Sequence, residues 1–189
     1  NLLYVLVTYL FVPRHIEEMK TKPTQQAIRL LNESAGITPD FILCRAPVML
    51  DEIRKKKIET YVNINSDFII SEPDIDTIYR VPLDLEKESL GVKILKKLNL
   101  PQKKEPNWET WKDLVEKISS PKDEIKVGII GKYVETGDFI LKDSYVSVMQ
   151  ALIHAGANSN VRISTKWINS NNLENDHFEN EIKEVDGIL

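Results

Sequence analysis

The chain has 189 residues, a length that suits one large domain or two smaller ones. Its hydrophobic content of 42%, charged content of 29% and net charge of −4 are ordinary for a globular protein and argue against a general nucleic-acid binder. No apolar run reaches the roughly 18 residues that a membrane span requires, and the single cysteine, Cys44, permits no internal disulfide, which fits a reducing, cytoplasmic setting.

The first part of the chain alternates apolar stretches with helical patterns. We predict strands at residues 2–12, 41–44 and 68–70, and helices at residues 26–31 and 51–61. The first strand is apolar almost throughout, which is typical of a parallel strand buried on both faces. Alternating strands and helices predict a parallel, doubly wound α/β sheet with its ligand at the carboxyl ends of the strands.

The middle of the chain is less regular. We expect an extended segment at residues 78–82 and a helix at residues 85–98, interrupted by Gly91. Residues 100–107 are polar and carry two prolines, which indicates a connection between domains. A further helix is predicted at residues 108–118, with its tryptophans used for packing.

A second α/β unit follows. Strands are predicted at residues 125–130 and 161–168, and between them a helix at residues 144–155, ended by Gly156. Residues 169–184 are polar and acidic, and we expect mostly loop or exposed helix there. The last residues, 186–189, resemble the start of a strand, so we expect the chain to be an internal piece of a longer protein or to lack residues at both ends.

A basic segment, Lys20-Thr21-Lys22-Pro23-Thr24-Gln25, lies between the first strand and the first helix. Proline is favoured in the first turn of a helix, which places both lysines near a helix N-terminus. Cations are disfavoured there by roughly 0.3–1 kcal/mol each, unless an anion such as phosphate binds between them and the free N–H groups. The other interpretation is a solvated loop with its lysines in water.

The K-T-K-P-T-Q sequence resembles the pyrimidine-nucleotide motif of the CTP synthase family. Further landmarks of that family follow in the expected order, at Pro39-Asp40, residues 42–45, Lys57-Ile58, residues 74–82, residues 127–135 and residues 143–145. The resemblance covers nearly the whole chain and is weakest around residues 84–122.

The resemblance implies an enzyme of two domains in each subunit of a homotetramer. An amidoligase domain uses ATP and Mg²⁺ to phosphorylate the 4-oxygen of UTP, and ammonia from a glutamine amidotransferase domain displaces the phosphate to give CTP. In this chain, residues 1–83 would be the C-terminal part of the Rossmann-like amidoligase domain. Residues 84–122 would be a linker with helices, and residues 123–189 the first βαβ part of a class I glutamine amidotransferase domain.

The resemblance also implies roles for individual residues. The residues expected to bind UTP or the product CTP are Lys20, Thr21, Lys22, Pro23, Thr24, Gln25 and Lys57. The segment Pro73, Asp74, Ile75 would lie near the adenine of ATP, and Lys132 and Tyr133 would belong to a region that couples the two reactions and responds to GTP. Two positions depart from the family pattern, since basic residues are expected where Pro73 and Val146 stand.

The chemistry of the complete enzyme needs more than this chain supplies. There is no phosphate-binding G-x-x-x-x-G-K-[ST] loop and no amidotransferase nucleophile motif in the sequence. We interpret Cys44 as a buried hydrophobe, and His15, His154 and His177 as surface or packing residues. We therefore expect no catalytic residue, no metal ligand and no activity in the isolated piece.

Two other functions remain open. The chain could be a non-catalytic module that senses CTP or UTP, or part of an unrelated ATP-dependent carboxylate or amide ligase of the same fold class. For Lys57, the other interpretation is that Lys55-Lys56-Lys57 is a solvated C-terminal helix end.

Overall fold

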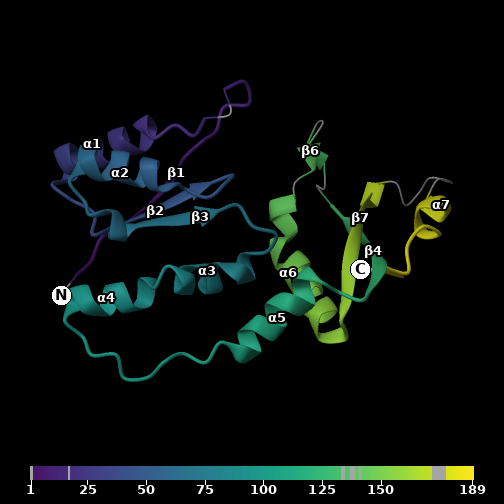
Figure 1. The fold of residues 1–189 in the computed structure, drawn as a ribbon. Helices are drawn as coiled ribbons and strands as arrows, with labels where there is room; N and C mark the ends of the chain where they lie inside the picture. Colours follow the sequence, from purple (N-terminus) through teal and green to yellow (C-terminus); the bar gives the residue numbers. More distant parts are fainter. Residues whose placement is uncertain (1, 17, 133–134, 137–138, 141, 172–177) are drawn as a thin grey trace. The chain divides into compact units, whose positions relative to one another are not determined.

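The computed structural model describes residues 2–16, 18–132, 135–136, 139–140, 142–171 and 178–189 (Figure 1). The chain divides into two compact units, Asn1–Trp108 and Glu109–Leu189. Within the described residues, no helix is both long enough and apolar enough to cross a membrane.

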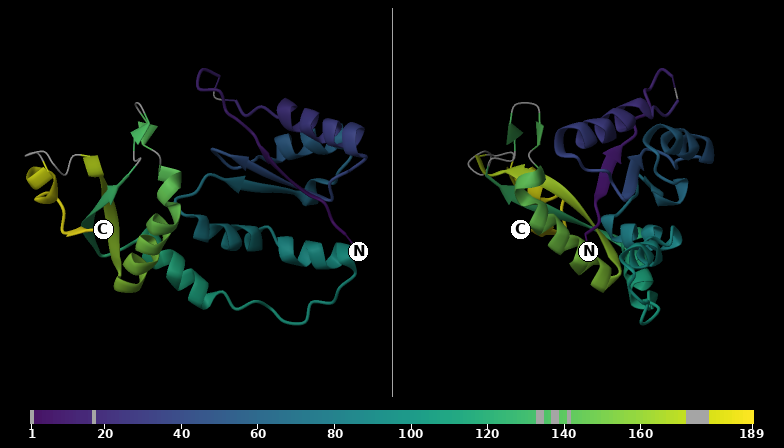
Figure 2. Two further views of the ribbon diagram at one scale, coloured as in Figure 1. Left: turned by 180° about the vertical axis from the view of Figure 1, so that it is seen from behind. Right: turned by 90° about the vertical axis from the view of Figure 1, so that its left-hand side faces the viewer.

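The first unit is built on a three-stranded parallel sheet in the order β1-β2-β3. These strands are Val5–Tyr9, Phe41–Ala46 and Ile69–Pro73, so the predicted parallel sheet is confirmed. Helices α1 (Lys22–Ala35) and α2 (Glu52–Val62) lie on one face of the sheet, and α3 (Val81–Lys87) and α4 (Leu90–Leu98) lie on the other (Figures 1 and 2). Two 3-10 turns, η1 (Ser66–Phe68) and η2 (Ile78–Arg80), precede β3 and α3.

Each face of this sheet has its own hydrophobic core. Under α1 and α2, side chains such as Leu10, Ile42 and Ile69 are fully buried. Under α3 and α4, Phe41, Ile70 and Leu90 are buried, and Leu43 and Leu85 pack against them. Because successive strand residues point to opposite faces, a three-layer unit needs apolar side chains at both parities of β2 and β3, which the sequence provides.

The predicted helices form where their capping residues stand. Helix α1 has Pro23 in its first turn and ends at Gly36, which has the left-handed φ of 65° that favours glycine. In α2, the Asp51 carboxylate caps the helix by accepting a hydrogen bond from the Arg54 backbone N–H at 2.7 Å. The predicted helices at residues 26–31 and 51–61 are therefore confirmed.

The expectation of a first strand buried on both faces is wrong. On β1, Val5, Val7 and Tyr9 remain 47%, 60% and 50% exposed. Helices α3 and α4 pack against the cluster of Phe41, Ile70 and Leu90. The same face of β1 is left open, although the residues of β1 are as apolar as those of β2.

The predictions for residues 78–98 are also corrected. Residues 78–82 are helical instead of extended, because Pro82 lies in the first turn of α3. The single predicted helix is two helices, and the break falls at Ser89, whose φ is 54°, while Gly91 lies inside α4. Both helices belong to the first unit.

The second unit contains a parallel sheet in the order β7-β4-β8, which agrees with the predicted α/β pattern. Strands β4 (Asp123–Gly131), β7 (Val161–Asn169) and β8 (Gly187–Ile188) form it, and helices α5 (Glu109–Ser119) and α6 (Val146–Ser159) pack on each other. A hairpin of β5 (Glu135–Thr136) and β6 (Phe139–Ile140), the turn η3 (Lys142–Tyr145) and α7 (Phe178–Ile182) complete the elements.

The prediction that Gly156 ends its helix is wrong. Helix α6 continues past it to Ser159 and stops at Asn160, which has a φ of 56°. Gly156 is instead a close-approach residue, since an added Cβ would lie 2.6 Å from the Val161 carbonyl oxygen.

Candidate functional site

The basic segment at residues 20–25 lies at the start of a helix, as predicted. Helix α1 begins at Lys22, and Thr21 precedes it without a side-chain capping bond. Both lysines are therefore close to the positive end of the helix dipole, where the sequence alone would disfavour them.

Three side chains of the segment are turned into the protein. Thr21, Thr24 and Gln25 are 4%, 0% and 3% exposed. The Thr24 hydroxyl lies 3.0 Å from the Thr8 hydroxyl of β1, and Gln25 Nε2 donates to Thr21 Oγ1 at 3.4 Å. The first contact holds the helix start on the sheet, and the second lies within the helix start. Whether the same side chains bind a nucleotide stays a prediction. Lys22 and Pro23 are exposed.

Lys20 is drawn to a carboxylate beside the helix start. Its ammonium donates to Glu18 Oε2 at 2.5 Å. This hydrogen bond is the main reason why the pKa of Glu18 is lowered, and the positive charges of Lys20, Arg54 and Lys57 lower it further. An anionic oxygen is thus stabilised at this place by cations from the segment and from α2.

Arg54 is a residue that the sequence prediction missed. Its Nε donates to the Met19 carbonyl oxygen at 3.3 Å, which ties α2 to the residue before Lys20. Its guanidinium also pairs with Asp51. The signal was available, because Arg54 precedes Lys57 by three residues and therefore lies on the same side of a helix.

The lysine run on α2 is not a helix end. Lys55, Lys56 and Lys57 lie in the middle of α2, so the alternative interpretation as a solvated C-terminus is wrong. Lys56 pairs with Glu59 at 2.7 Å, and Lys55 lies 3.6 Å from Glu88. Among the described residues Lys57 forms no ion pair, which leaves its ammonium available to a ligand.

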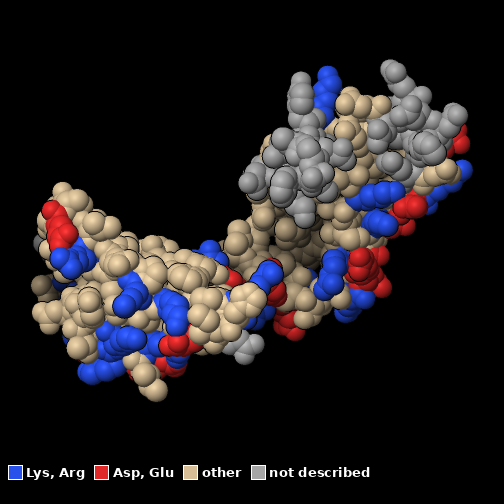
Figure 3. Space-filling view, turned by 90° about the horizontal axis from the view of Figure 1, so that it is seen from above, with Lys and Arg blue, Asp and Glu red and all other residues tan. Residues whose placement is uncertain are grey.

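Figure 3 looks onto the first unit from the side of α1 and α2, where blue Lys and Arg atoms gather in several patches. The exposed lysines of these helices include Lys22, Lys56 and Lys57. A clustered positive surface attracts anionic ligands even in a chain whose net charge is −4.

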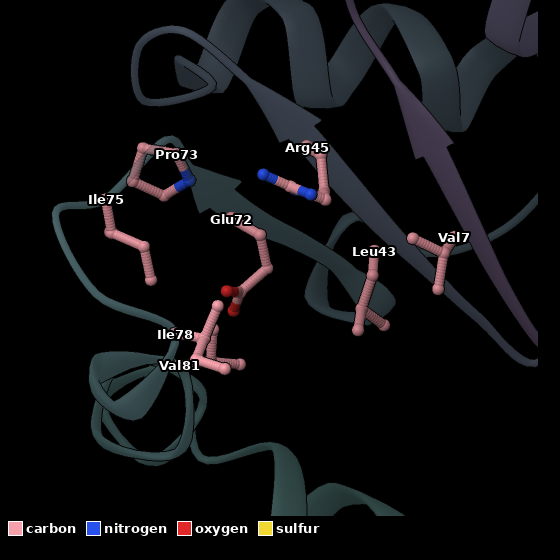
Figure 4. Close-up of a pocket in the computed structure, with 8 residues that line it drawn as sticks. All are labelled: Val7, Leu43, Arg45, Glu72, Pro73, Ile75, Ile78 and Val81. Carbon is pink, nitrogen blue, oxygen red and sulfur yellow. The ribbon is translucent and has the colours of Figure 1, made fainter. Parts of the chain in front are cut away.

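A cavity of about 260 Å³ lies next to the segment predicted to serve ATP (Figure 4). Pro73 and Ile75 line it, whereas Asp74 accepts a hydrogen bond from Arg45 Nη2 at 3.1 Å. The other lining residues come from all three strands and from the segment that begins with η2, namely Val7, Leu43, Arg45, Glu72, Ile78 and Val81. The contact of residues 73–75 with ATP stays a prediction.

Glu72 is a second residue that the sequence prediction missed. Its side chain is only 6% exposed, and burial raises its pKa to about 7, helped by the negative charges of Asp84 and Glu88 and opposed by Arg45. Within the described part of the chain, its Oε1 is buried without a hydrogen-bond partner. The sequence did contain a signal, namely a carboxylate at the end of an apolar strand. In the β2–β3 register this residue pairs with Arg45.

In the second unit, Lys132 is exposed just after β4. Its carbonyl oxygen accepts a hydrogen bond from the Tyr145 hydroxyl at 2.7 Å, and the Tyr145 ring lies 5.4 Å from that of Trp167. Tyr133 lies outside the described residues, and Val146 is exposed. A role of this region in coupling or GTP response stays a prediction.

The remaining candidate groups behave as packing or surface residues. Cys44 is fully buried, and burial raises the pKa of its thiol to about 12, which confirms its interpretation as a buried hydrophobe. His15 and His154 are exposed, while His177 lies outside the described residues. The described residues contain no group of three His, Cys, Asp or Glu side chains that could hold a metal ion.

Comparison with known proteins gives one consistent result. The family model described as "CTP synthase N-terminus" matches residues 1–100. The chain is similar to proteins named CTP synthase from Methanocaldococcus jannaschii (40% identity over 100% of the chain), Cytophaga hutchinsonii (40% over 97%) and Sulfolobus acidocaldarius (39% over 100%). It spans about a third of the length of these relatives, 35%, 32% and 35% respectively.

Proposed function

The chain belongs to the CTP synthase family, and from this premise we propose that the protein carrying it makes CTP from UTP. ATP phosphorylates the 4-oxygen of UTP in this reaction, and ammonia from glutamine hydrolysis displaces the phosphate. The observation that carries the proposal is the basic helix start. It lies inside the matched residues 1–100 and gathers Lys20, Arg54 and Lys57 around one carboxylate.

We assign the triphosphate of UTP, or of the product CTP, to this helix start. The ammonium groups of Lys20, Lys22 and Lys57 suit phosphate oxygens as movable point charges, and the N-terminus of α1 adds its dipole. The segment that carries Lys20 and Lys22 is shaped by its other residues, Thr21, Pro23, Thr24 and Gln25. Glu18 now occupies part of this positive field, and a bound triphosphate would compete with it for Lys20.

The remaining parts of the reaction are distributed over the two units and beyond. ATP is proposed to lie beside Pro73, Asp74 and Ile75, and the second unit is proposed to begin the glutamine amidotransferase domain. GTP would act as an activator near Lys132 and Tyr133. Mg²⁺ is proposed, from the family resemblance, to be bound mainly by parts of the protein outside this chain. A homotetramer in the cytoplasm is proposed from the family resemblance.

The test is CTP binding by the protein that carries this sequence, measured by calorimetry. Lys20→Ala and Lys22→Ala should each weaken binding about tenfold or more, because a hydrogen bond to a charged group contributes roughly 1.5–3 kcal/mol. Lys104→Ala is the matched control, since Lys104 is an exposed lysine in the same unit. The affinity of this variant for CTP should equal that of the wild type. The wild-type affinity should fall as salt is raised.

Two results would contradict the proposal. Unchanged CTP affinity in both lysine variants would remove the triphosphate from the helix start. Tight CTP binding without formation of CTP from UTP, ATP and ammonia would favour a sensing module instead of an enzyme.

A further inference from the structure

The Glu72 carboxylate is buried between β3 and the segment that leads into α3. Its side chain extends from β3 toward Ile78 and Val81 (Figure 4), and only 6% of the residue is exposed. Its Oε1 has essentially no accessible surface and, within the described residues, no hydrogen-bond partner. Neither water nor a protein donor stabilises a charge on this atom, so ionisation of Glu72 is costly while α3 covers it.

The charged groups around Glu72 do not compensate for this burial. The carboxylates of Asp84, in α3, and Glu88, which follows α3, act on it in the same direction as burial, and Arg45 of β2 acts against them. The Arg45 side chain is 55% exposed and donates to Asp74 at 3.1 Å, which weakens its effect on Glu72. Together, burial and these charges raise the pKa of Glu72 to about 7.

Each of the two facing carboxylates has a lysine partner of its own. Lys87 donates to Asp84 at 2.6 Å, and Lys55 of α2 lies 3.6 Å from Glu88. A carboxylate held in an ion pair carries its charge, so an ionised Glu72 faces two negative groups on the side of α3.

Helix α3 is the element that can respond to this charge. It has seven residues, and none of them is fully buried. It is separated from α4 by Ser89, whose φ of 54° breaks the helical path, whereas α4 contributes the buried Leu90 to the core. A short helix with few buried contacts opens locally at a lower free energy than the sheet below it.

We propose that Glu72 is a pH-sensitive switch for α3: the neutral carboxyl group lets α3 pack over β3, and the ionised carboxylate drives α3 away from β3, with Ser89 as the hinge and α4 left in place. Opening admits water to Glu72 and increases its distance from Asp84 and Glu88. The switch goes beyond the proposed function, because it requires no nucleotide.

The direction of the pH effect follows from the two protonation equilibria. The pKa of Glu72 is about 7 in the closed structure, against 4.5 for an ordinary glutamate, so the closed form holds the proton more tightly than the open form. The contribution of Glu72 to closure is fully present below pH 4.5 and is lost as pH rises through 7. Between pH 6 and pH 8 the ratio of open to closed α3 should therefore rise about tenfold.

Hydrogen–deuterium exchange of the protein that carries this sequence measures the opening. Exchange is followed at pH 6 and pH 8, with exchange times scaled to the chemical exchange rate at each pH. Protection of the amides in residues 81–88 should fall about tenfold at pH 8, while that of β2 should not change. In Glu72→Gln, which keeps the shape of the side chain but cannot ionise, α3 should be equally protected at both pH values.

Glu105→Gln is the control, because Glu105 is an exposed carboxylate in the same unit and its variant should keep the wild-type pH dependence. If Glu72→Gln does not fold, the wild-type comparison still decides. Equal protection of α3 at the two pH values in the wild type, or the same fall in Glu72→Gln, overturns the proposal. A loss of protection in β2 as large as in α3 also overturns it, because the whole unit would then be opening.

Discussion

At the scale of single residues, Glu72 and Thr24 show opposite uses of a buried polar group. Thr24 is fully buried and lies 3.0 Å from the Thr8 hydroxyl, so its polar atom has a partner inside the protein. Glu72 is almost as buried, but one of its oxygens has no partner among the described residues. The first group therefore stabilises the fold, and the second weakens it.

The pH dependence of stability tests the burial of Glu72. Its pKa is raised from 4.5 to about 7, so the folded state holds the proton more tightly than the unfolded state does. The contribution of Glu72 to stability is fully present below pH 4.5 and is lost as pH rises toward 7. Glu72→Gln should therefore match the wild type near pH 4.5 and exceed its free energy of unfolding by on the order of 2–3 kcal/mol at pH 8.

Urea unfolding at both pH values measures this difference. Glu105→Gln, at an exposed position, should show little difference from the wild type at either pH. A Glu72→Gln effect of the same size at pH 4.5 and pH 8 would mean that Glu72 is not buried as the structure places it.

At the scale of elements, two glycines inside helices behave differently because of what lies next to them. Gly156 in α6 lies against β7, and an added Cβ would be 2.6 Å from the Val161 carbonyl oxygen. Gly91 in α4 has nothing within 4 Å of an added Cβ. Helix propensity favours alanine over glycine by about 1 kcal/mol at both positions, so only the tertiary contact separates them.

We expect Gly91→Ala to stabilise the protein by up to about 1 kcal/mol. Gly156→Ala should destabilise it by roughly 1–3 kcal/mol, because the helix must move away from the strand. Urea unfolding of both variants measures the two effects. Stabilisation by both substitutions would show that α6 does not approach Val161 as closely as the structure indicates.

At the scale of the whole molecule, the chain divides into two units, and the first unit ends with a segment that has no regular structure. Residues 100–107 form no helix or strand and are exposed, and the units divide between Trp108 and Glu109. Exposed, irregular segments are preferred sites of proteolysis. Brief digestion with trypsin should therefore cut first after Lys103 or Lys104, and mass spectrometry should find two stable fragments. Earlier cuts within α4 or α5 would contradict this division.

Much of the first unit could be predicted from local patterns. Pro23 and Gly36 mark both ends of α1, Asp51 caps α2, and the apolar runs of β2 and β3 predict parallel strands between two helical layers. The basic segment was also placed correctly at a helix start. These features depend on residues close together in the chain, so the sequence alone contains their physical cause.

Other features could not be predicted, because distant segments create them. The exposed face of β1 depends on where α3 and α4 lie, and Gly156 is needed because β7 passes beside α6. The sequence around Glu72 resembles any strand end with a carboxylate, and its burial depends on the segment that carries Ile78 and Val81. The sequence by itself thus determined the strands of the first sheet, the helices α1 and α2, the family and the basic helix start. The tertiary structure decided which side chains are buried, where the cavity lies and which oxygen has no partner among the described residues, since solvent exclusion is a property of packed neighbours.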